Sequence, residues 1–187
     1  MKVSREQAAE NREKILTTAA KLFRERGFDG IGVADLMKTA GLTHGGFYGH
    51  FSSKEDLMAQ ACIRAADEIL QGAGERRAGK TDDPFRAYVE FYLSVGHRDH
   101  SGSGCLMAAL GADAARQSPP VRHAFTVSFK RLLQALMAIV PTKPHTTSRD
   151  HALATLATLV GAQVIARAVD DQKLSKEILQ TVLKQLS

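Results

Sequence analysis

The amino-acid sequence predicts an all-α protein of about nine helices, and three observations support this prediction. Apolar residues recur at intervals of three and four, and alternation with period two is never sustained. Gly27, Gly41 and Pro84 lie where these stretches end or begin, at positions that favour helix termini. Apolar residues make up 44% of the 187 residues, which is enough for an ordinary globular core without disulfides or metals.

The first three predicted helices form a small N-terminal unit. One helix ends at Gly27, a short one begins near Val33 and ends at Gly41, and a third spans about residues 43–51. Phe47 and Phe51 are four residues apart and therefore share the inward face of the third helix. The apolar spacing predicts a shared core of Leu22, Phe23, Val33, Met37, Phe47 and Phe51.

The rest of the chain predicts a larger helical unit. Ser52 or Ser53 has capping-box spacing to an acidic residue, so a fourth helix should begin there, before a glycine-rich loop at 72–81. A second loop is expected at 97–104. The further helices are expected to begin at Asp83-Pro84, Cys105, Ser118-Pro119, Thr147 or Ser148, and Ser175. We therefore expect two domains, residues 1–58 and 59–187.

Composition narrows the possible environments of the protein. Two cysteines are too few for a disulfide-rich secreted scaffold, the N-terminus has no apolar signal segment, and no apolar run reaches the roughly 18 residues of a membrane span. These features predict a cytoplasmic protein without a membrane partner. The net charge is +5, but residues 1–58 carry nine Lys or Arg against eight Asp or Glu. The position of the charges must therefore determine any binding of a polyanion.

The turn containing Gly41 joins the second and third helices as in a helix-turn-helix unit. In that arrangement the later helix enters the major groove of DNA and presents its first residues to base edges. Two glycines in so short a helix cost about 1 kcal/mol each relative to alanine, so close approach to DNA is a plausible reason for them. The residues predicted to approach bases are Thr43, His44, Gly45 and Gly46.

Three further side chains are predicted to contact phosphates. Tyr48 and His50 are flanked by the buried phenylalanines, so they should leave the core face and extend sideways. Lys54 lies at the start of the next helix, where free backbone N–H groups and the helix dipole also favour an anion. Such contacts position a protein on DNA without reading its sequence.

Residues 12–58 resemble the DNA-binding domain of the TetR family of regulators. The most specific part is the stretch Gly46-Phe47-Tyr48-Gly49-His50-Phe51-Ser52-Ser53-Lys54-Glu55-Asp56-Leu57. The resemblance implies a homodimer, a two-fold symmetric operator in double-stranded DNA, and a C-terminal domain that binds a small-molecule effector and then lowers DNA affinity. It also implies phosphate contacts by Tyr48, His50 and Lys54.

The sequence departs from the family pattern at several positions. Ile31 and Gly32 stand where a hydroxyl residue usually caps the second helix, His44 replaces a common Lys or Arg, and Gly49 replaces a long polar residue. Base contacts should therefore be few. Contacts from an N-terminal arm carrying Arg5 and Arg12 would then matter more.

The C-terminal helices provide candidates for an effector site and a dimer interface, although each pattern also fits an ordinary core. The candidate effector residues are Tyr88, Tyr92, Cys105, Phe125, Phe129, Gln163 and Arg167. Gln163 and Arg167 are four apart on an apolar helix and either contact a ligand or pair across the dimer. The interface candidates, on the last two helices, are Leu156, Val160, Val164, Leu179, Val182 and Leu183.

Alternative functions centre on Cys105. At a helix N-terminus its thiol would favour the thiolate, so redox or electrophile sensing is an alternative to simple ligand binding, as is an activator or a sensor of the same fold. His97, His100 and Cys105 have spacing that a metal requires, but three ligands on one loop make a poor zinc site. An enzyme with a cysteine nucleophile lacks a supporting acid or oxyanion arrangement. We therefore expect no catalytic residues, metal or cofactor.

Overall fold

A computed structural model of the chain describes residues 4–78 and 83–186, and it confirms the all-α fold class. The described ranges contain nine α-helices, two 3-10 helices and no β-strand. The α-helices are α1 (Arg5–Arg26), α2 (Val33–Thr39), α3 (Lys54–Ala78), α4 (Pro84–Tyr92), α5 (Val95–Asp99), α6 (Leu106–Ala114), α7 (Pro119–Met137), α8 (Ser148–Ala168) and α9 (Gln172–Leu186). The 3-10 helices are η1 (His44–Gly49) and η2 (Ser101–Ser103).

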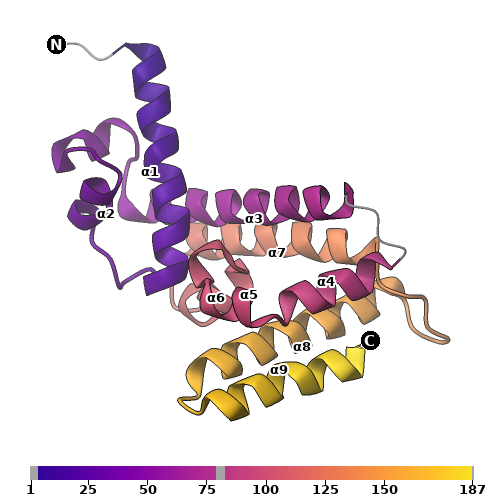
Figure 1. Cartoon of the computed structure of the whole chain (residues 1–187). Coiled ribbons are helices and arrows are strands. Elements are labelled where there is room, and N and C mark those ends of the chain that lie inside the picture. The colour runs from indigo at the N-terminus through magenta and orange to yellow at the C-terminus, as the bar shows by residue number, and fades with distance from the viewer. Residues whose placement is uncertain (1–3, 79–82, 187) are drawn as a thin grey trace.

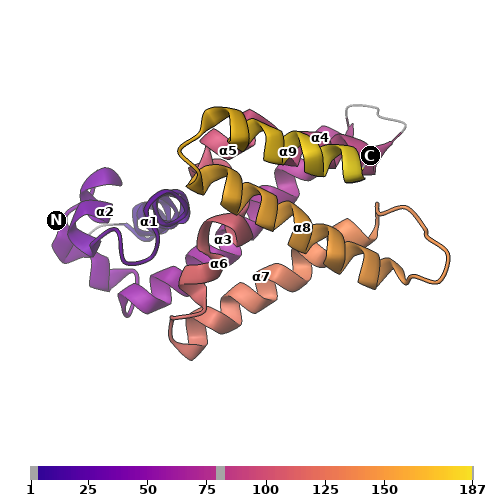
Figure 2. The ribbon, with the colours of Figure 1, turned by 90° about the horizontal axis from the view of Figure 1, so that it is seen from below.

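The helices form a small N-terminal unit attached to a larger bundle (Figure 1). Helices α1 and α2 and the 3-10 helix η1 pack together, and α3 leaves this unit and runs along α7 through the bundle. Helices α8 and α9 pack against each other at the side of the bundle opposite α3 (Figures 1 and 2). The predicted boundary at residues 58 and 59 falls inside α3, which therefore belongs to both units.

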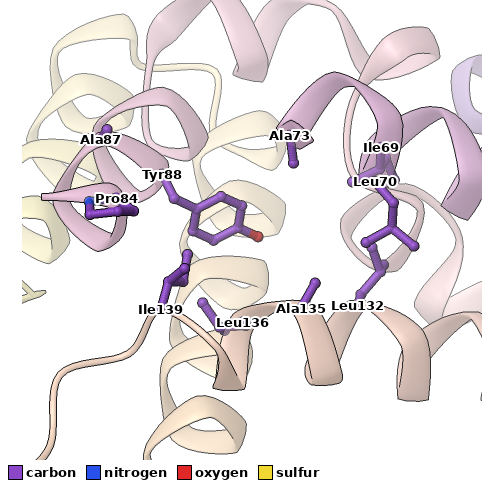
Figure 3. Close-up of a pocket in the computed structure, with 10 residues that line it drawn as sticks. All are labelled: Ile69, Leu70, Ala73, Pro84, Ala87, Tyr88, Leu132, Ala135, Leu136 and Ile139. Carbon is purple, nitrogen blue, oxygen red and sulfur yellow. The ribbon is translucent and has the colours of Figure 1, made fainter. Parts of the chain in front are cut away.

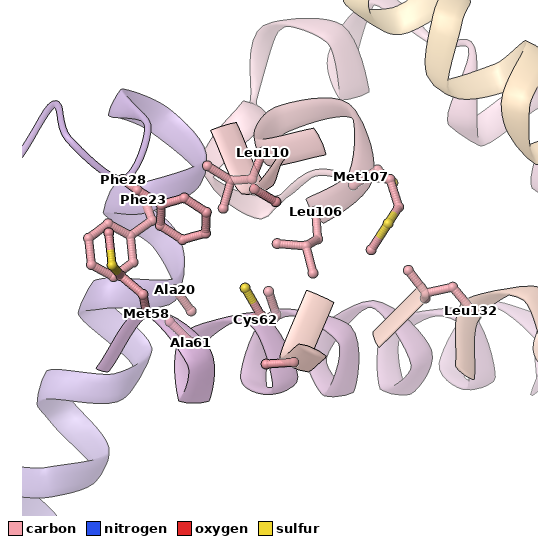
Figure 4. Packing of buried hydrophobic residues seen from close by; sticks show 14 of the residues in the cluster. Ala20, Phe23, Phe28, Met58, Ala61, Cys62, Leu106, Met107, Leu110 and Leu132 are labelled. Carbon is pink, nitrogen blue, oxygen red and sulfur yellow. The ribbon is translucent and has the colours of Figure 1, made fainter. Parts of the chain in front are cut away.

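One continuous apolar core joins the two units (Figure 4). Phe23 and Phe28, with ring centroids 5.4 Å apart, lie at its N-terminal end. Leu106 and Leu110 of α6 pack there against Cys62 of α3, and all of these side chains are buried. Because the core is shared, a shift of α6 or α3 must be transmitted to α1.

Local sequence signals explain most helix ends. Gly27 ends α1 with φ 77°, as predicted, and its N–H bonds to the Phe23 carbonyl. The side chains of Asp83 and Thr147 accept backbone N–H groups at the starts of α4 and α8, which confirms both predicted caps. Ser175, by contrast, is not a cap. It lies inside α9, and the carboxylate of Asp171 accepts the N–H groups of the first turn.

Two predicted loops are wrong. Helix α3 continues through Gly72 to Ala78, so the first residues of the expected 72–81 loop are helical, and residues 79–82 lie outside the described residues. The expected loop at 97–104 contains most of α5 and all of η2. Ser94 starts α5 by accepting the N–H of His97, a cap that the apolar spacing does not reveal.

Helix α8 is long and apolar enough, by length and composition alone, to cross a membrane. In its most apolar window, however, 44% of the residues are buried inside the protein. Its polar residues Thr155 and Gln163 are among the buried ones. One face of α8 therefore packs in the folded bundle and buries polar as well as apolar side chains.

Candidate nucleic-acid interface and effector cavities

The helix-turn-helix geometry that the sequence predicts is present at α2 and η1. Gly41 takes φ 73° in the turn, and the Leu42 N–H closes it by bonding to the Met37 carbonyl at 2.9 Å. The third helix differs from the prediction because residues 44–49 form a 3-10 helix. Phe47 and Phe51 anchor it from beneath, both buried, with ring centroids 5.8 Å apart.

The outward face of η1 presents most of the residues predicted to touch DNA. Tyr48 is 69% exposed, and its ring stands edge-on to Phe47 with centroids 5.2 Å apart. Thr43 and His44 are exposed, and His50 is half-buried. These side chains are therefore accessible from solvent, and the exposed Tyr48 ring packs edge-on against the buried Phe47 ring.

Three glycines on the same surface have no structural requirement within the protein. Gly45, Gly46 and Gly49 do not have positive φ angles. A Cβ atom at Gly45 or Gly49 would meet nothing within 4 Å, and one at Gly46 would make ordinary contacts at 3.7 and 3.9 Å. Since the fold would tolerate side chains here, the glycines fit a surface that another molecule approaches closely.

The start of α3, beside η1, is held in place by its own side chains. Ser53 caps the helix by accepting the N–H of Asp56, and the Asp56 carboxylate accepts bonds from Ser52 at 3.0 Å. A hydrogen bond from Gln60, with further bonds from Ser52, lowers the pKa of Asp56. Lys54 is the first residue of α3, so its charge adds to the helix dipole.

Arg12 does not act as a free arm residue, contrary to expectation. Its guanidinium lies over the Phe51 ring, 4.9 Å from the centroid, and bonds to the side chain of Gln60 in α3. Arg12 thus supports η1 from behind. Arg5, in the first turn of α1, is exposed and remains a candidate for contact with DNA.

An apolar cavity of about 120 Å³ opens between α3, α4 and α7 (Figure 3). Tyr88 of α4 points into it, opposite Ala135 and Leu132 of α7. Its other lining residues are Ile69, Leu70, Ala73, Pro84, Ala87, Leu136 and Ile139. Of the predicted effector residues, Tyr88 alone lines this cavity.

A second, more polar cavity of about 70 Å³ adjoins the first. Its walls include Tyr92 and Cys105, two predicted effector residues, together with Tyr88. His97, which sequence reasoning considered only as a metal ligand, also lines it and accepts the N–H of Cys105 at 2.9 Å. The two cavities share walls formed by Ile69, Tyr88 and Leu132.

The other predicted effector residues have different positions. Phe125 and Phe129 are half-buried against the core and line neither cavity. Gln163 donates to the Tyr92 carbonyl, and Arg167 donates to the carbonyls of His97 and Arg98, both at 2.9 Å. Gln163 therefore holds the end of α4, and Arg167 holds α5, against α8 within the same chain.

The predicted interface residues also divide into two groups. Leu156 and Leu179 are each 2% exposed and belong to the core of a single chain, so the prediction was wrong for them. Val164 is 44% exposed, and Val160, Val182 and Leu183 are half-buried. Helices α8 and α9 pack against each other within the chain. This contact covers the part of each helix's apolar face that points toward the other helix.

No group of three or more His, Cys, Asp or Glu suited to a metal ion occurs among the described residues. Cys62 and Cys105 are both free thiols. Burial raises the pKa of Cys62 to about 12.

The fold and these two sites define a helix-turn-helix regulator with a helical second domain. Residues 15–61 match the family model of bacterial regulatory proteins of the tetR family. A transcriptional regulator of Mycobacterium tuberculosis, MT0206, is 30% identical over 173 residues, which cover 86% of each protein. The chain therefore belongs to the TetR family and is a DNA-binding transcriptional regulator.

A second relative, the repressor NemR of Escherichia coli K12, is 32% identical over 118 residues. That alignment covers 62% of this chain and 59% of NemR, so the chain matches about three-fifths of NemR's length. The crystal structure of reduced E. coli NemR superposes with a TM-score of 0.78 at 25% identity and covers 95% of each chain. The likeness of fold thus extends well beyond the DNA-binding unit.

Proposed function

We propose that this regulator is a cytoplasmic repressor that binds a two-fold symmetric operator as a homodimer and leaves it when a small molecule occupies the bundle. The observation that carries the proposal is the surface of η1, where exposed Tyr48 and three glycines face outward beside Lys54. NemR, a repressor by name, supports the repressing mode.

Exposed apolar side chains on α8 and α9 support the homodimer. Val164 and Ile165 are 44% and 53% exposed, and Leu174 of α9 is 42% exposed. Three such side chains on two adjacent helices are what a four-helix interface between two copies would cover. In that dimer the two η1 elements would need a spacing of about 34–36 Å to enter successive major grooves.

Effector control follows from the position of the cavities. The polar cavity is lined by Gly104 and Cys105, which precede α6, and α6 packs on α1. A ligand that favours another position of α6 would shift the population away from the DNA-binding spacing.

The test is titration of the purified protein onto the DNA upstream of its own gene at several salt concentrations. We expect specific binding that weakens steeply between about 50 and 200 mM salt. Tyr48→Phe should weaken binding about tenfold, and Lys54→Ala should reduce the salt slope by about one phosphate contact. Lys130→Ala, an exposed lysine on α7, is the matched control and should change neither. Unchanged affinity in both the Tyr48 and Lys54 variants would overturn the phosphate assignments.

Cys105 supports a second candidate, a redox- or electrophile-sensing regulator. It lines the polar cavity at the start of α6, so modification of its sulfur would disturb the same wall as a ligand. With its pKa near 12, Cys62 holds a negligible thiolate fraction at about pH 8. Cys105→Ser should abolish release from DNA by an alkylating agent such as N-ethylmaleimide, whereas Cys62→Ser should retain it. Release that persists without Cys105 would exclude this candidate.

A further inference from the structure

One residue of the polar cavity wall, Tyr92, and one residue next to that wall, Arg167, each have a buried donor atom without a hydrogen-bond partner among the described residues. Tyr92 is 2% exposed and lines the cavity, and its hydroxyl has no hydrogen-bond partner among the described residues. A buried hydroxyl without a partner costs roughly 1–3 kcal/mol. Burial, followed by the neighbouring Cys105 and Tyr88, raises the pKa of Tyr92 well above its usual range, so the phenol stays protonated; the thiol of Cys105 interacts with it only weakly, short of ordinary hydrogen-bond geometry, and the hydroxyl can donate to a better acceptor.

Arg167 does not itself line the cavity, but its guanidinium lies next to Gly104 of the cavity wall. Its Nη2 would lie 3.2 Å from a Cβ at Gly104, a residue of the cavity wall. Two of its nitrogens donate to backbone carbonyls, while Nη1 is buried and has no hydrogen-bond partner in the part of the chain that the structure describes. No carboxylate lies within ion-pair distance of Arg167 among those residues. Burial lowers the pKa of Arg167, and only the more distant charge of Asp99, which pairs with Arg98, opposes this among the carboxylates, so an anionic ligand in direct contact would stabilise the guanidinium.

Glu68 is the one carboxylate that lines this cavity among the described residues, and it is already neutralised. Glu68 pairs with Arg24 at 2.6 Å and with Arg64 at 3.3 Å. The wall therefore combines a paired acid on α3 with the Tyr92 phenol on α4, and the guanidinium of Arg167 on α8 lies next to it without an ion pair among the described residues. The excess of donors at this end favours a ligand that brings acceptor oxygens and negative charge.

The adjoining cavity provides the complementary surface for the rest of the ligand. Its walls are almost wholly aliphatic, with Tyr88 between the two cavities. From these features we infer that the two cavities form one site for an amphipathic monocarboxylate. Its apolar body lies among α3, α4 and α7, and its carboxylate accepts hydrogen bonds from Tyr92 and Arg167. The inference rests on the proposed function in taking this site to be the effector site.

The test measures binding to the full-length protein without DNA, by titration calorimetry. The probes are three acids with their uncharged amides: benzoate and benzamide, octanoate and octanamide, and 4-phenylbutyrate and 4-phenylbutyramide. We expect at least one acid to bind, and to bind at least about tenfold more tightly than its amide, because charge-assisted bonds are the stronger ones. If none of the acids is preferred over its amide, the inference is wrong.

Variants assign the site within the protein. Tyr92→Phe should lower the affinity for the acid about tenfold. It should cause no loss of thermal stability, because it removes a hydroxyl without a hydrogen-bond partner of ordinary geometry. Tyr48→Phe is the matched control and should leave acid binding unchanged. Arg167→Gln should abolish the preference for the acid; because Arg167 also holds α5, the Tyr92→Phe result decides the assignment if the Arg167 variant does not fold. Unaltered acid binding in Tyr92→Phe would overturn the assignment.

Variants of α7 test the apolar end. Ala135→Leu would fill the apolar cavity and should reduce binding of the acid at least about tenfold, whereas Ala138→Leu, an exposed position at the end of the same helix, should not. If both variants bind the acid with equal affinity, the apolar body of the ligand does not occupy this cavity.

A separate measurement distinguishes this inference from the proposed function. DNA affinity is measured by fluorescence anisotropy with and without the acid that binds. Calorimetric binding without release from DNA would retain the ligand site and refute effector control. Release of the DNA by an uncharged molecule, when no acid binds, would retain effector control and refute the carboxylate site.

Discussion

The guanidinium of Arg24 in α1 donates to the backbone oxygen of Gly104 at 3.3 Å, and this bond joins the DNA-binding unit to the wall of the polar cavity. Arg24 is 4% exposed and also bonds to Glu68 of α3. A Cβ at Gly104 would lie 3.0 Å from His97 and 3.2 Å from Arg167. Gly104 therefore lies between the DNA-binding unit and the residues that surround the proposed carboxylate.

Replacement of Arg24 should destabilise the whole chain. Arg24→Met removes the buried partner of Glu68 and of the Gly104 carbonyl, so we expect the free energy of unfolding to fall by about 3 kcal/mol. Urea denaturation followed by circular dichroism measures the change. Arg26→Met, an exposed position two residues further on, should change the stability by less than about 0.5 kcal/mol. Equal effects of the two variants would show that the bonds of Arg24 contribute nothing.

The glycines of η1 allow stability and DNA binding to be separated. Gly45→Ala places a methyl group in open space, so the fold should be unchanged or gain up to about 1 kcal/mol. DNA affinity should nevertheless fall about tenfold or more, because the methyl group would hold the backbone away from DNA. Gly74→Ala, in α3 with equally open surroundings, is the matched control. Retained DNA affinity in Gly45→Ala would refute the close approach.

Two glycines with positive φ should differ in their tolerance of alanine. Gly27 combines φ 77° with ψ 168°, a region that essentially only glycine occupies, and a Cβ there would lie 2.5 Å from an Asp113 oxygen. Gly41 has φ 73° with open space around it. We expect a loss of about 3 kcal/mol for Gly27→Ala and about 1 kcal/mol for Gly41→Ala. Thermal unfolding measures both; a larger loss at Gly41 would contradict the prediction.

The lowered pKa of Asp56 predicts a contribution to stability that depends on pH. Because the folded protein favours the charged carboxylate, this contribution is fully present above the ordinary pKa of 3.8 and is lost as pH falls through the lower folded value. Asp56→Asn should therefore cost about 1 kcal/mol at neutral pH and progressively less below about pH 4. Urea midpoints across this range test it, with Asp170→Asn, an exposed position, as control. A cost that does not vary with pH would disprove the electrostatic origin.

The helical pattern and the exposure of Thr43, His44 and Tyr48 could be predicted because apolar spacing and short motifs are local properties. The 3-10 geometry of η1 could not, because the four-residue spacing of Phe47 and Phe51 is that of an α-helix, whereas Phe51 in fact lies beyond the end of η1 at Gly49. The continuation of α3 through Gly72 was missed because packing against α7 outweighs the low helix propensity of glycine.

Side-chain roles that depend on tertiary contacts were the least predictable. Leu156 and Leu179 form part of a stripe that fits either a core or an interface, and only the packing of α8 on α9 shows that both are internal. Arg12 has the charge expected of a DNA contact, but Phe51 and Gln60 engage it. No local pattern marks Arg24 or His97, whose partners are 80 and 8 residues away in the chain.

The glycine-rich face of η1 also limits how this regulator can acquire new target genes. In the proposed complex with DNA, the glycines Gly45, Gly46 and Gly49 would leave mainly Thr43 and His44 as side chains near the bases. Discrimination among DNA sites must then depend largely on groove width and on how readily the duplex bends. Drift of an operator should be tolerated where it preserves that shape, and exchanging Thr43 or His44 should redirect binding less than it would in a regulator that reads bases with long side chains.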